Sequence, residues 1–309
     1  MHLGFLTVCL GNIPLKEKAK WASENGFKAL EVACWPRGND RDYSSSDIDV
    51  ANLTPAEAET IKAYFKEYGL TISSLAYYDN NLHKDPETRA YINNHVKKCI
   101  GAAALLGTPL VGTFVGRNSD KDIVGNFEEY EKVFSDLVGY AESKGIKLMI
   151  ENCDMLGWQQ KGVPGTISYS PELWAEMFRR IPSKSFGINF DPSHLVHLLI
   201  DYVKAAEFIK DRIFHVHAKD TKLLPEKLDM YGIFDRQLFT GDEHDRFGFW
   251  KPRMPGYGDV DWGKFIAALK SFGYDGVIST EHEDPDYEGS ESKVKEALLL
   301  GKAHLEKLI

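Results

Sequence analysis

The chain has 309 residues, 43% of them hydrophobic, which suffices to bury the core of a large domain and argues against disorder. Its formal net charge of -9 argues against a surface for nucleic acid or acidic membranes, because such surfaces need clustered Lys and Arg. A small neutral or cationic substrate is compatible with this charge.

Runs rich in β-branched and aromatic residues alternate along the chain with segments of helical periodicity. The predicted strands are 3–10, 27–35, 70–78, 109–116, 146–152, 186–191, 212–220 and 276–284. The predicted helices are 14–26, 54–69, 86–106, 126–145, 170–181, 193–211, 261–273 and 290–309. The second helix has the clearest start, since Thr54, Pro55 and Glu57 stand close to a capping box.

Eight strand–helix units without a break in composition predict a single α/β domain over residues 1–309, folded as a (β/α)8 TIM barrel. A doubly wound open sheet is the rival fold, but no strand-to-helix turn carries a Gly-rich phosphate loop. Residues 221–258 interrupt the pattern after the seventh strand, and we expect a long loop insertion there. Loops of this length are usually functional, and both a lid and a subunit interface fit the segment.

Four of the later predicted strands end on a side chain that binds metals or transfers protons. These side chains are Glu151, Asp191, His217 and Glu281. A carboxylate in an apolar run costs several kcal/mol unless it is paired or bound to a cation. Because the carboxyl ends of barrel strands meet at one face, we expect the four to hold one divalent metal ion. Three carboxylates and an imidazole suit Mn²⁺ first, with Mg²⁺, Co²⁺, Fe²⁺ and Zn²⁺ as alternatives.

Such an ion would act as a Lewis acid on a sugar. A neutral polyol or keto sugar that chelates through adjacent oxygens fits the site better than a free phosphate does. Removal of a proton next to a carbonyl requires stabilisation of the resulting enediolate, which a metal provides. One carboxylate then removes the proton and a second one returns it.

The motifs IENC, FDPSH, HVHAKD and TEHED, in this order, resemble those of the xylose-isomerase-like TIM barrels. This family holds sugar isomerases and epimerases of the ketose 3-epimerase and inosose dehydratase type, and it is related to the endonuclease IV fold. The resemblance implies that the four strand-end side chains are the metal ligands. It also implies that Glu151 and Glu281 are the acid and base on opposite faces of the substrate, and that His194 contacts a substrate oxygen.

Two positions depart from the ketose 3-epimerase pattern. Those epimerases carry a second glutamate where this chain has Gly157, and an arginine where it has Leu223. Their substrate contacts are therefore not carried over as a whole.

Further candidates surround the predicted metal site. Lys219 shares the inward parity of His217 and would polarise a substrate oxygen, unless it is simply a solvated lysine at a strand end. Arg253 in the insertion would bind a distal oxygen or carboxylate of the substrate, or else pack against a partner subunit. Trp158 is interpreted as an aromatic platform for a sugar, with simple packing as the alternative. Cys153 is interpreted as a small buried thiol.

The cysteines and the N-terminal residues indicate the cellular compartment in which the protein is expected. The four cysteines are scattered without a CxxC, which is typical of reduced thiols. The N-terminus lacks the pattern of a signal peptide, and no apolar run approaches the roughly 18 residues that span a bilayer. We expect a cytoplasmic protein that binds a small sugar and that binds neither nucleic acid nor membranes. A homo-oligomer is compatible with the sequence.

The sequence thus predicts a divalent-metal-dependent sugar isomerase or epimerase that acts on a ketose or keto sugar through a metal-stabilised enediolate. A metal-dependent lyase or dehydratase acting on a keto sugar or 3-keto-glycoside is the main alternative. Further rivals are a metal-free glycosidase that uses Glu151 and Glu281, an endonuclease-IV-like enzyme, which the net charge opposes, and a non-catalytic sugar-binding protein.

Overall fold

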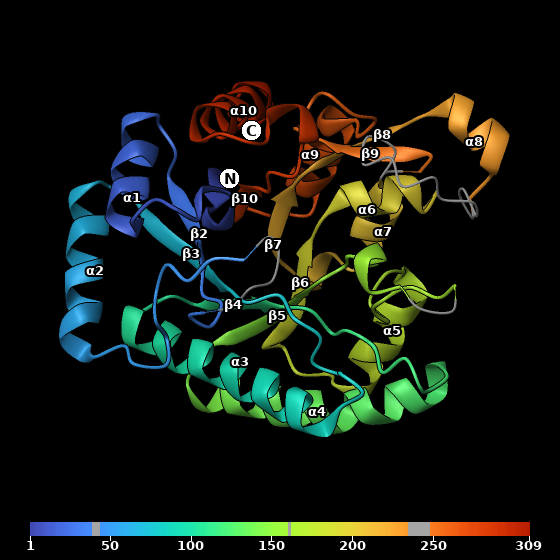
Figure 1. Cartoon of the computed structure of the whole chain (residues 1–309), viewed down its shortest axis with the longest axis horizontal. Coiled ribbons are helices and arrows are strands. Elements are labelled where there is room, and N and C mark those ends of the chain that lie inside the picture. The colour runs from blue at the N-terminus through green and yellow to red at the C-terminus, as the bar shows by residue number, and fades with distance from the viewer. Residues whose placement is uncertain (39–43, 160–161, 234–247) are drawn as a thin grey trace.

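The strands of the protein close into a parallel barrel, as the sequence predicts (Figure 1). The computed structural model describes residues 1–38, 44–159, 162–233 and 248–309. Within these residues the barrel order is β1-β10-β7-β6-β5-β4-β3-β2. The barrel strands are β1 (His2–Leu6), β2 (Ala29–Ala33), β3 (Thr71–Ala76), β4 (Leu110–Thr113), β5 (Lys147–Glu151), β6 (Phe186–Phe190), β7 (Ile213–Ala218) and β10 (Val277–Thr280).

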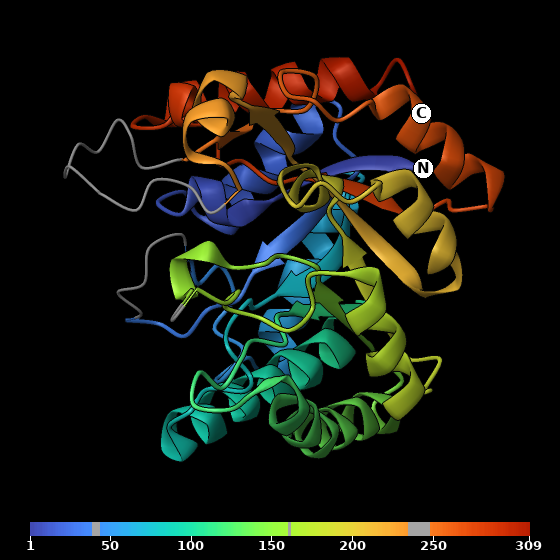
Figure 2. The same ribbon diagram turned by 90° about the vertical axis from the view of Figure 1, so that its right-hand side faces the viewer.

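Helices surround the barrel on its outside (Figures 1 and 2). They are α1 (Leu15–Glu24), α2 (Pro55–Glu67), α3 (Pro86–Leu106), α4 (Ile123–Ser143), α5 (Pro171–Arg180), α6 (Pro192–His197), α7 (Tyr202–Phe208), α8 (Pro225–Tyr231), α9 (Trp262–Ser271) and α10 (Glu291–Leu305). Among the described residues, none of the helices combines the length and the apolar character that crossing a bilayer would require.

The apolar core lies between the strands and these helices. Phe186 at the start of β6 packs against Phe134 of α4 with ring centroids 5.7 Å apart, and Phe190 at its end stacks on Phe265 of α9 at 5.5 Å. Since side chains alternate along a strand, the intervening Asn189 points into the barrel. Outward apolar residues thus fix the strand and leave its inward positions free for polar groups.

Helix starts follow local capping chemistry. Thr54 accepts a hydrogen bond from the backbone N–H of Glu57, and the Glu57 carboxylate accepts one from the backbone of Thr54, so the predicted capping box is present. Asp85 and Asp122 cap α3 and α4 in the same manner through their side chains.

The predicted helix 193–211 is in fact two helices, α6 and α7. Leu199 between them has a φ of 57°, which a continuing helix does not allow. Asp201 then caps α7 by accepting hydrogen bonds from the N–H groups of Val203 and Lys204 at 3.1 Å each. This break keeps the short helix α6 over the carboxyl end of β6.

The segment after β7, predicted as a loop insertion, contains regular elements in its described part. Strands β8 (Asp220–Leu223) and β9 (Trp250–Arg253) form a two-stranded antiparallel sheet, and α8 lies beyond them at the periphery of the molecule (Figure 1). Residues 234–247 of the predicted insertion lie outside the described residues. Leu223 pairs with Trp250. The two residues are far apart in the sequence, so local periodicity could not predict that their segments form a sheet.

Asp220 fastens this segment to the barrel. Its fully buried carboxylate accepts hydrogen bonds from the backbone N–H groups of Thr221, Gly256 and Val260 and from the indole N–H of Trp262, at 2.9 to 3.0 Å. The four donors belong to β8, to the chain after β9 and to α9. The Asp220 side chain therefore links three parts of the chain through hydrogen bonds.

We predict that Asp220→Asn lowers the free energy of unfolding by about 3 kcal/mol, because the amide group presents its own N–H donors to buried N–H groups. Urea denaturation followed by circular dichroism measures the change. Asp229→Asn on the exposed side of α8 is the matched control and should stay within about 0.5 kcal/mol of the parent. Equal midpoints for Asp220→Asn and the parent would contradict this role.

Candidate functional site

The carboxyl ends of β5, β6 and β10 bring three predicted ligands together. Glu151 ends β5, Asp191 follows β6 and Glu281 follows β10, and all three are buried. One ligand atom from each, together with one from His194, lie within 4.8 Å of one another. The predicted convergence of strand ends thus produces one cluster of carboxylates and an imidazole.

Asp191 is held firmly but keeps one oxygen without a hydrogen bond. Its Oδ1 accepts the backbone N–H of Ser193 at 2.7 Å, which caps α6. Asn152 fixes its backbone through two hydrogen bonds of 2.8 Å. Its buried Oδ2 has no hydrogen-bond partner in the described part of the chain, and His194 Nε2 stands 3.5 Å away. Burial raises the pKa of Asp191, so an ion at this oxygen would relieve an unfavourable environment.

His217 lies between two carboxylates from different strands. Its Nδ1 is 2.7 Å from Oε1 of Glu151 and 3.5 Å from Oε2 of Glu281, while its Nε2 is 2.8 Å from Oε2 of Glu31. Burial alone would lower the pKa of His217, but the surrounding carboxylates raise it well above its usual range. The predicted ligand therefore faces the space between the two glutamates, although it stands outside the 4.8 Å group.

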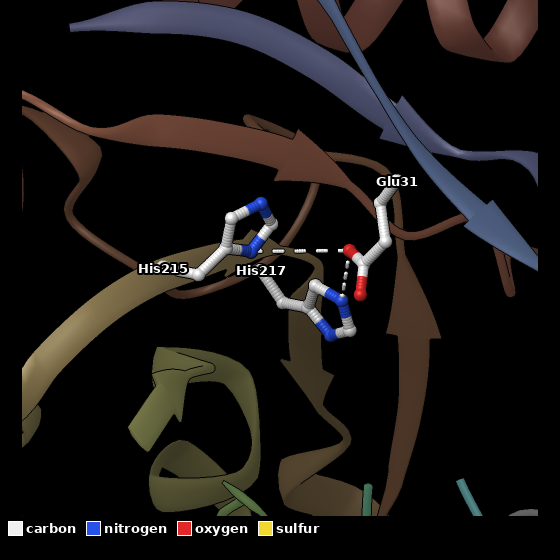
Figure 3. Close-up of side chains that lie close together, drawn as sticks. All are labelled: Glu31, His215 and His217. Atoms are coloured by element: carbon white, nitrogen blue, oxygen red, sulfur yellow. Dashed lines mark hydrogen bonds and ion pairs between the residues drawn. The ribbon is translucent and has the colours of Figure 1, made fainter. Parts of the chain in front are cut away.

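Glu31 is a residue of the candidate site that the sequence interpretation missed. It lies fully buried on β2, on the opposite side of His217 from Glu151, and Figure 3 shows its carboxylate in contact with the rings of both His217 and His215. Tyr78 donates a hydrogen bond of 2.7 Å to its other oxygen. Burial would raise the pKa of Glu31, yet the charge of His217 and these contacts lower it to about 2. A lone carboxylate within the apolar run 27–35 was the available signal.

His215 belongs to the polar layer beneath the cluster. Its Nδ1 donates to Asn189 Oδ1 at 3.0 Å, and its Nε2 accepts from the hydroxyl of Ser73 at 3.1 Å. Burial lowers its pKa to about 4, so the ring is neutral at pH 7. It completes a hydrogen-bonded network that supports Glu31 and His217 from below.

Lys219 is a buried cation of the site and not a solvated lysine. Its Nζ is 2.7 Å from Oε2 of Glu281, 3.0 Å from Oε2 of Glu283 and 3.6 Å from Oδ2 of Asp191. Burial alone would lower the pKa of Lys219, but these carboxylates raise it well above its usual range. The ammonium group therefore stays charged and offsets part of the negative charge of the cluster.

The cluster opens into a cavity of about 530 Å³. Glu151, His194, Lys219 and Glu281 lie in its lining, and aromatic rings form much of the remaining wall. The aromatic lining residues are Trp35, Tyr78, Phe114, Trp158 and Trp250. Polar groups at one end and ring faces around them are typical of a site for a small molecule with an apolar face. Trp158 thus lies in the wall of the cavity that Glu151 and Glu281 also line.

The structure does not bring Arg253 into this cavity. Its guanidinium pairs with Asp286 and lies 3.3 Å from Oδ2 of Asp284. Both aspartates follow β10, so the pairing holds β9 against the end of the barrel. Arg253 acts here as a structural contact, because the β8–β9 pairing turns its side chain toward these two carboxylates.

The matches to known proteins agree with the barrel fold. A model of the xylose isomerase-like TIM barrel family matches residues 19–304, so the chain belongs to that family. The uncharacterized protein YfiH of Bacillus subtilis is 26% identical over 302 residues, which cover 92% of this chain and 93% of YfiH.

Three solved structures share the fold at low sequence identity. The 3-keto-D-glucoside 4-epimerase YcjR of E. coli has a TM-score of 0.70 at 17% identity and 99% coverage of both chains. The probable 3-DHS dehydratase AsbF of Bacillus anthracis has a TM-score of 0.71 at 18% identity, again with 99% of both chains covered. The protein IolI, solved with a bound zinc atom, has a TM-score of 0.70 at 20% identity and covers 100% of this chain and 99% of its own.

We predict that Glu31→Gln lowers the pKa of His217 by about 1 or more, because it removes an opposite charge in direct contact. Histidine ring signals followed by NMR as a function of pH give this pKa in the protein without added metal. The exposed Glu59→Gln should leave it unchanged. An unchanged pKa in Glu31→Gln would show that Glu31 does not control this ring.

Proposed function

We propose that this protein is a divalent-metal-dependent sugar isomerase or epimerase, which moves a proton next to the carbonyl group of a ketose or keto sugar. The observation that carries the proposal is the buried cluster of Glu151, Asp191 and Glu281 at the end of a cavity. A family shared with sugar epimerases is consistent with it but leaves the reaction open.

The cluster fits a divalent ion. The carboxylates of Glu151, Asp191 and Glu281 would hold it together with Nδ1 of His217, whose other nitrogen Glu31 keeps in place. Oδ2 of Asp191, which accepts no hydrogen bond from the residues that the structure describes, fits this assignment. Carboxylates with one nitrogen suit Mn²⁺ best. When bound, the ion would supply Lewis-acid stabilisation of charge that develops on substrate oxygens.

The two glutamates are the proton carriers in this proposal. Burial would raise the pKa of Glu151, but the charge of His217 outweighs burial and lowers it, so the group is a carboxylate at neutral pH. Glu281 is held ionised in the same way by Lys219. One glutamate would therefore accept a proton from a substrate carbon. The other would take up a proton from solvent and donate it to the opposite face of that carbon or to its neighbour.

The remaining polar groups of the cavity would orient the substrate. His194 Nε2 is buried and has no hydrogen-bond partner among the described residues, which leaves it for a substrate oxygen. Lys219 lies next to Glu281 and would steady a developing negative charge. Trp158, set edge-on against Phe114 at 5.5 Å, would cover the apolar face of a sugar ring.

A second cavity favours a lyase or dehydratase acting on a 3-keto-glycoside as the alternative. It measures about 580 Å³ and shares Gly157 and Trp158 with the first cavity. Its lining includes Arg37, Lys84 and Arg117. This space would take the group attached to a keto sugar, and loss of that group after proton removal would be an elimination.

A metal-free glycosidase accounts for fewer of these contacts. It would use Glu151 and Glu281 and give no reason for the buried Asp191 and His217 beside them. Chelator treatment separates the cases, because a glycosidase of this type would keep its activity.

We predict that the protein, incubated with Mn²⁺ and a set of ketohexoses and 3-keto-glucosides in D₂O, places deuterium on a carbon next to the carbonyl of at least one of them. NMR and mass spectrometry of the recovered sugars detect this exchange, and the product distinguishes epimerisation from elimination. Chelation should abolish the exchange and Mn²⁺ should restore it. Absence of exchange across the set, with metal bound, would contradict the proposal.

We further predict that Glu151→Gln and Glu281→Gln each lower the exchange rate at least about 100-fold, because general acid–base groups contribute that much. Glu172→Gln on the exposed side of α5 is the control and should keep the parent rate. A sugar-binding protein without activity would instead show no exchange in any form while still binding the sugar by calorimetry.

A further inference from the structure

A second group of metal-binding side chains lies on the other side of His194. Cys153 Sγ, an oxygen of Asp154 and a ring nitrogen of His194 all lie within 4.8 Å of one another. We propose that these three residues bind a second divalent cation, of the zinc type, distinct from the ion of the carboxylate cluster. Nothing in the proposed proton transfer requires this site.

The spacing of the donor atoms matches ligands better than hydrogen-bond partners. Asp154 Oδ1 and His194 Nδ1 are 3.6 Å apart, which is too far for a hydrogen bond. Nitrogen and oxygen ligands of tetrahedral zinc, at their usual bond lengths, stand about 3.3–3.5 Å from each other. A small adjustment of side chains would therefore close the site around an ion.

The donors come from the ends of two neighbouring strands. Cys153 and Asp154 lie in the loop that leaves β5, after Asn152, and His194 lies on α6 at the end of β6. The backbone N–H of Met155 donates to Cys153 Sγ at 3.3 Å, a contact that suits a thiolate ligand as well as a thiol. The donors thus come from adjacent strand ends, as those of the carboxylate cluster do.

His197 supports Asp154 from outside the group. Its Nε2 is 3.2 Å from Oδ1 of Asp154, and its ring stacks on Trp250 with centroids 4.0 Å apart and planes inclined by 5°. Metal-binding carboxylates commonly have such an outer hydrogen-bond partner. This contact holds Oδ1 of Asp154, the oxygen that also stands 3.6 Å from Nδ1 of His194.

Charge and ligand type select the ion. A thiolate, a carboxylate and a neutral imidazole carry two negative charges, so a dication gives a neutral group that is easily buried. Thiolate prefers Zn²⁺ or Co²⁺ to Mn²⁺ or Mg²⁺, unlike the carboxylate cluster. Cys153, Asp154 and His194 all lie in the cavity lining, so a fourth position would face the cavity, as in zinc sites that bind a water or a substrate atom.

His194 would join the two sites. Its Nδ1 faces Asp154, while its Nε2 is 3.5 Å from Asp191 and 3.8 Å from Glu151. With Nδ1 bound to the second ion, Nε2 carries the proton and becomes a donor toward the cavity. This arrangement agrees with the substrate contact proposed for His194.

Cobalt is the probe that tests the site without reference to activity. The full chain, stripped of metal and loaded with Co²⁺, should bind two ions and show a near-ultraviolet thiolate-to-cobalt band. Cys153→Ala should lose that band and one ion, whereas Cys99→Ala, a buried cysteine of α3, should keep both. Asp154→Asn keeps the shape of the side chain. It should lower the affinity for the ion that gives the band at least about tenfold.

Glu281→Gln separates this proposal from the proposed function. It should lower the affinity for the ion at the carboxylate cluster and leave the thiolate-to-cobalt band unchanged. Thermal unfolding verifies that each variant is folded. A parent protein without the band, or a cobalt count that is equal in the parent and in folded Cys153→Ala, would overturn the site. Asp154 would then only orient His194 and His197.

Discussion

The burial of carboxylates at one end of the barrel is the constraint on which the site depends. Glu31, Glu151, Asp191 and Glu281 are all within the barrel end and almost inaccessible to solvent. Two like charges 4.8 Å apart repel by about 3.5 kcal/mol at an effective dielectric constant of about 20. His217 and Lys219 return two positive charges to this group of four negative ones. The cluster therefore retains excess negative charge. This excess grows when His217 gives up its proton to become a ligand, and a dication offsets most of it.

The barrel provides this cluster because its strands are fixed by apolar contacts on their outer faces. Phe186 and Phe190 pack β6 against α4 and α9. Asn189 and Asp191, on either side of Phe190 in the sequence, take the inward positions. Asp191 has two roles, since one oxygen caps α6 and the other points to the cluster. The start of α6 thereby places His194 above the cavity. Fold and site are built from the same hydrogen bonds.

The sequence alone predicted the barrel, because eight strand and helix segments alternate along the chain. It also indicated the residues at the strand ends, because each of them follows an apolar run within a single strand. Glu31 was missed because its role depends on β2 lying opposite His217 across the barrel, which no local pattern indicates. The expectation for Arg253 missed its pairing with Asp284 and Asp286, which depends on the β8–β9 pairing. The break between α6 and α7 comes from Leu199 and the cap at Asp201, within a segment whose periodicity favours one helix.

The central claim is that one cation joins the ends of three strands. Anomalous diffraction from crystals grown with Mn²⁺ tests it most directly. The account predicts a manganese peak within about 2.0–2.4 Å of carboxylate oxygens from Glu151, Asp191 and Glu281, with Nδ1 of His217 turned toward it. A map without such a peak, in which His217 still bridges Glu31 and Glu151 and Lys219 still fills the space beside Asp191, would contradict it.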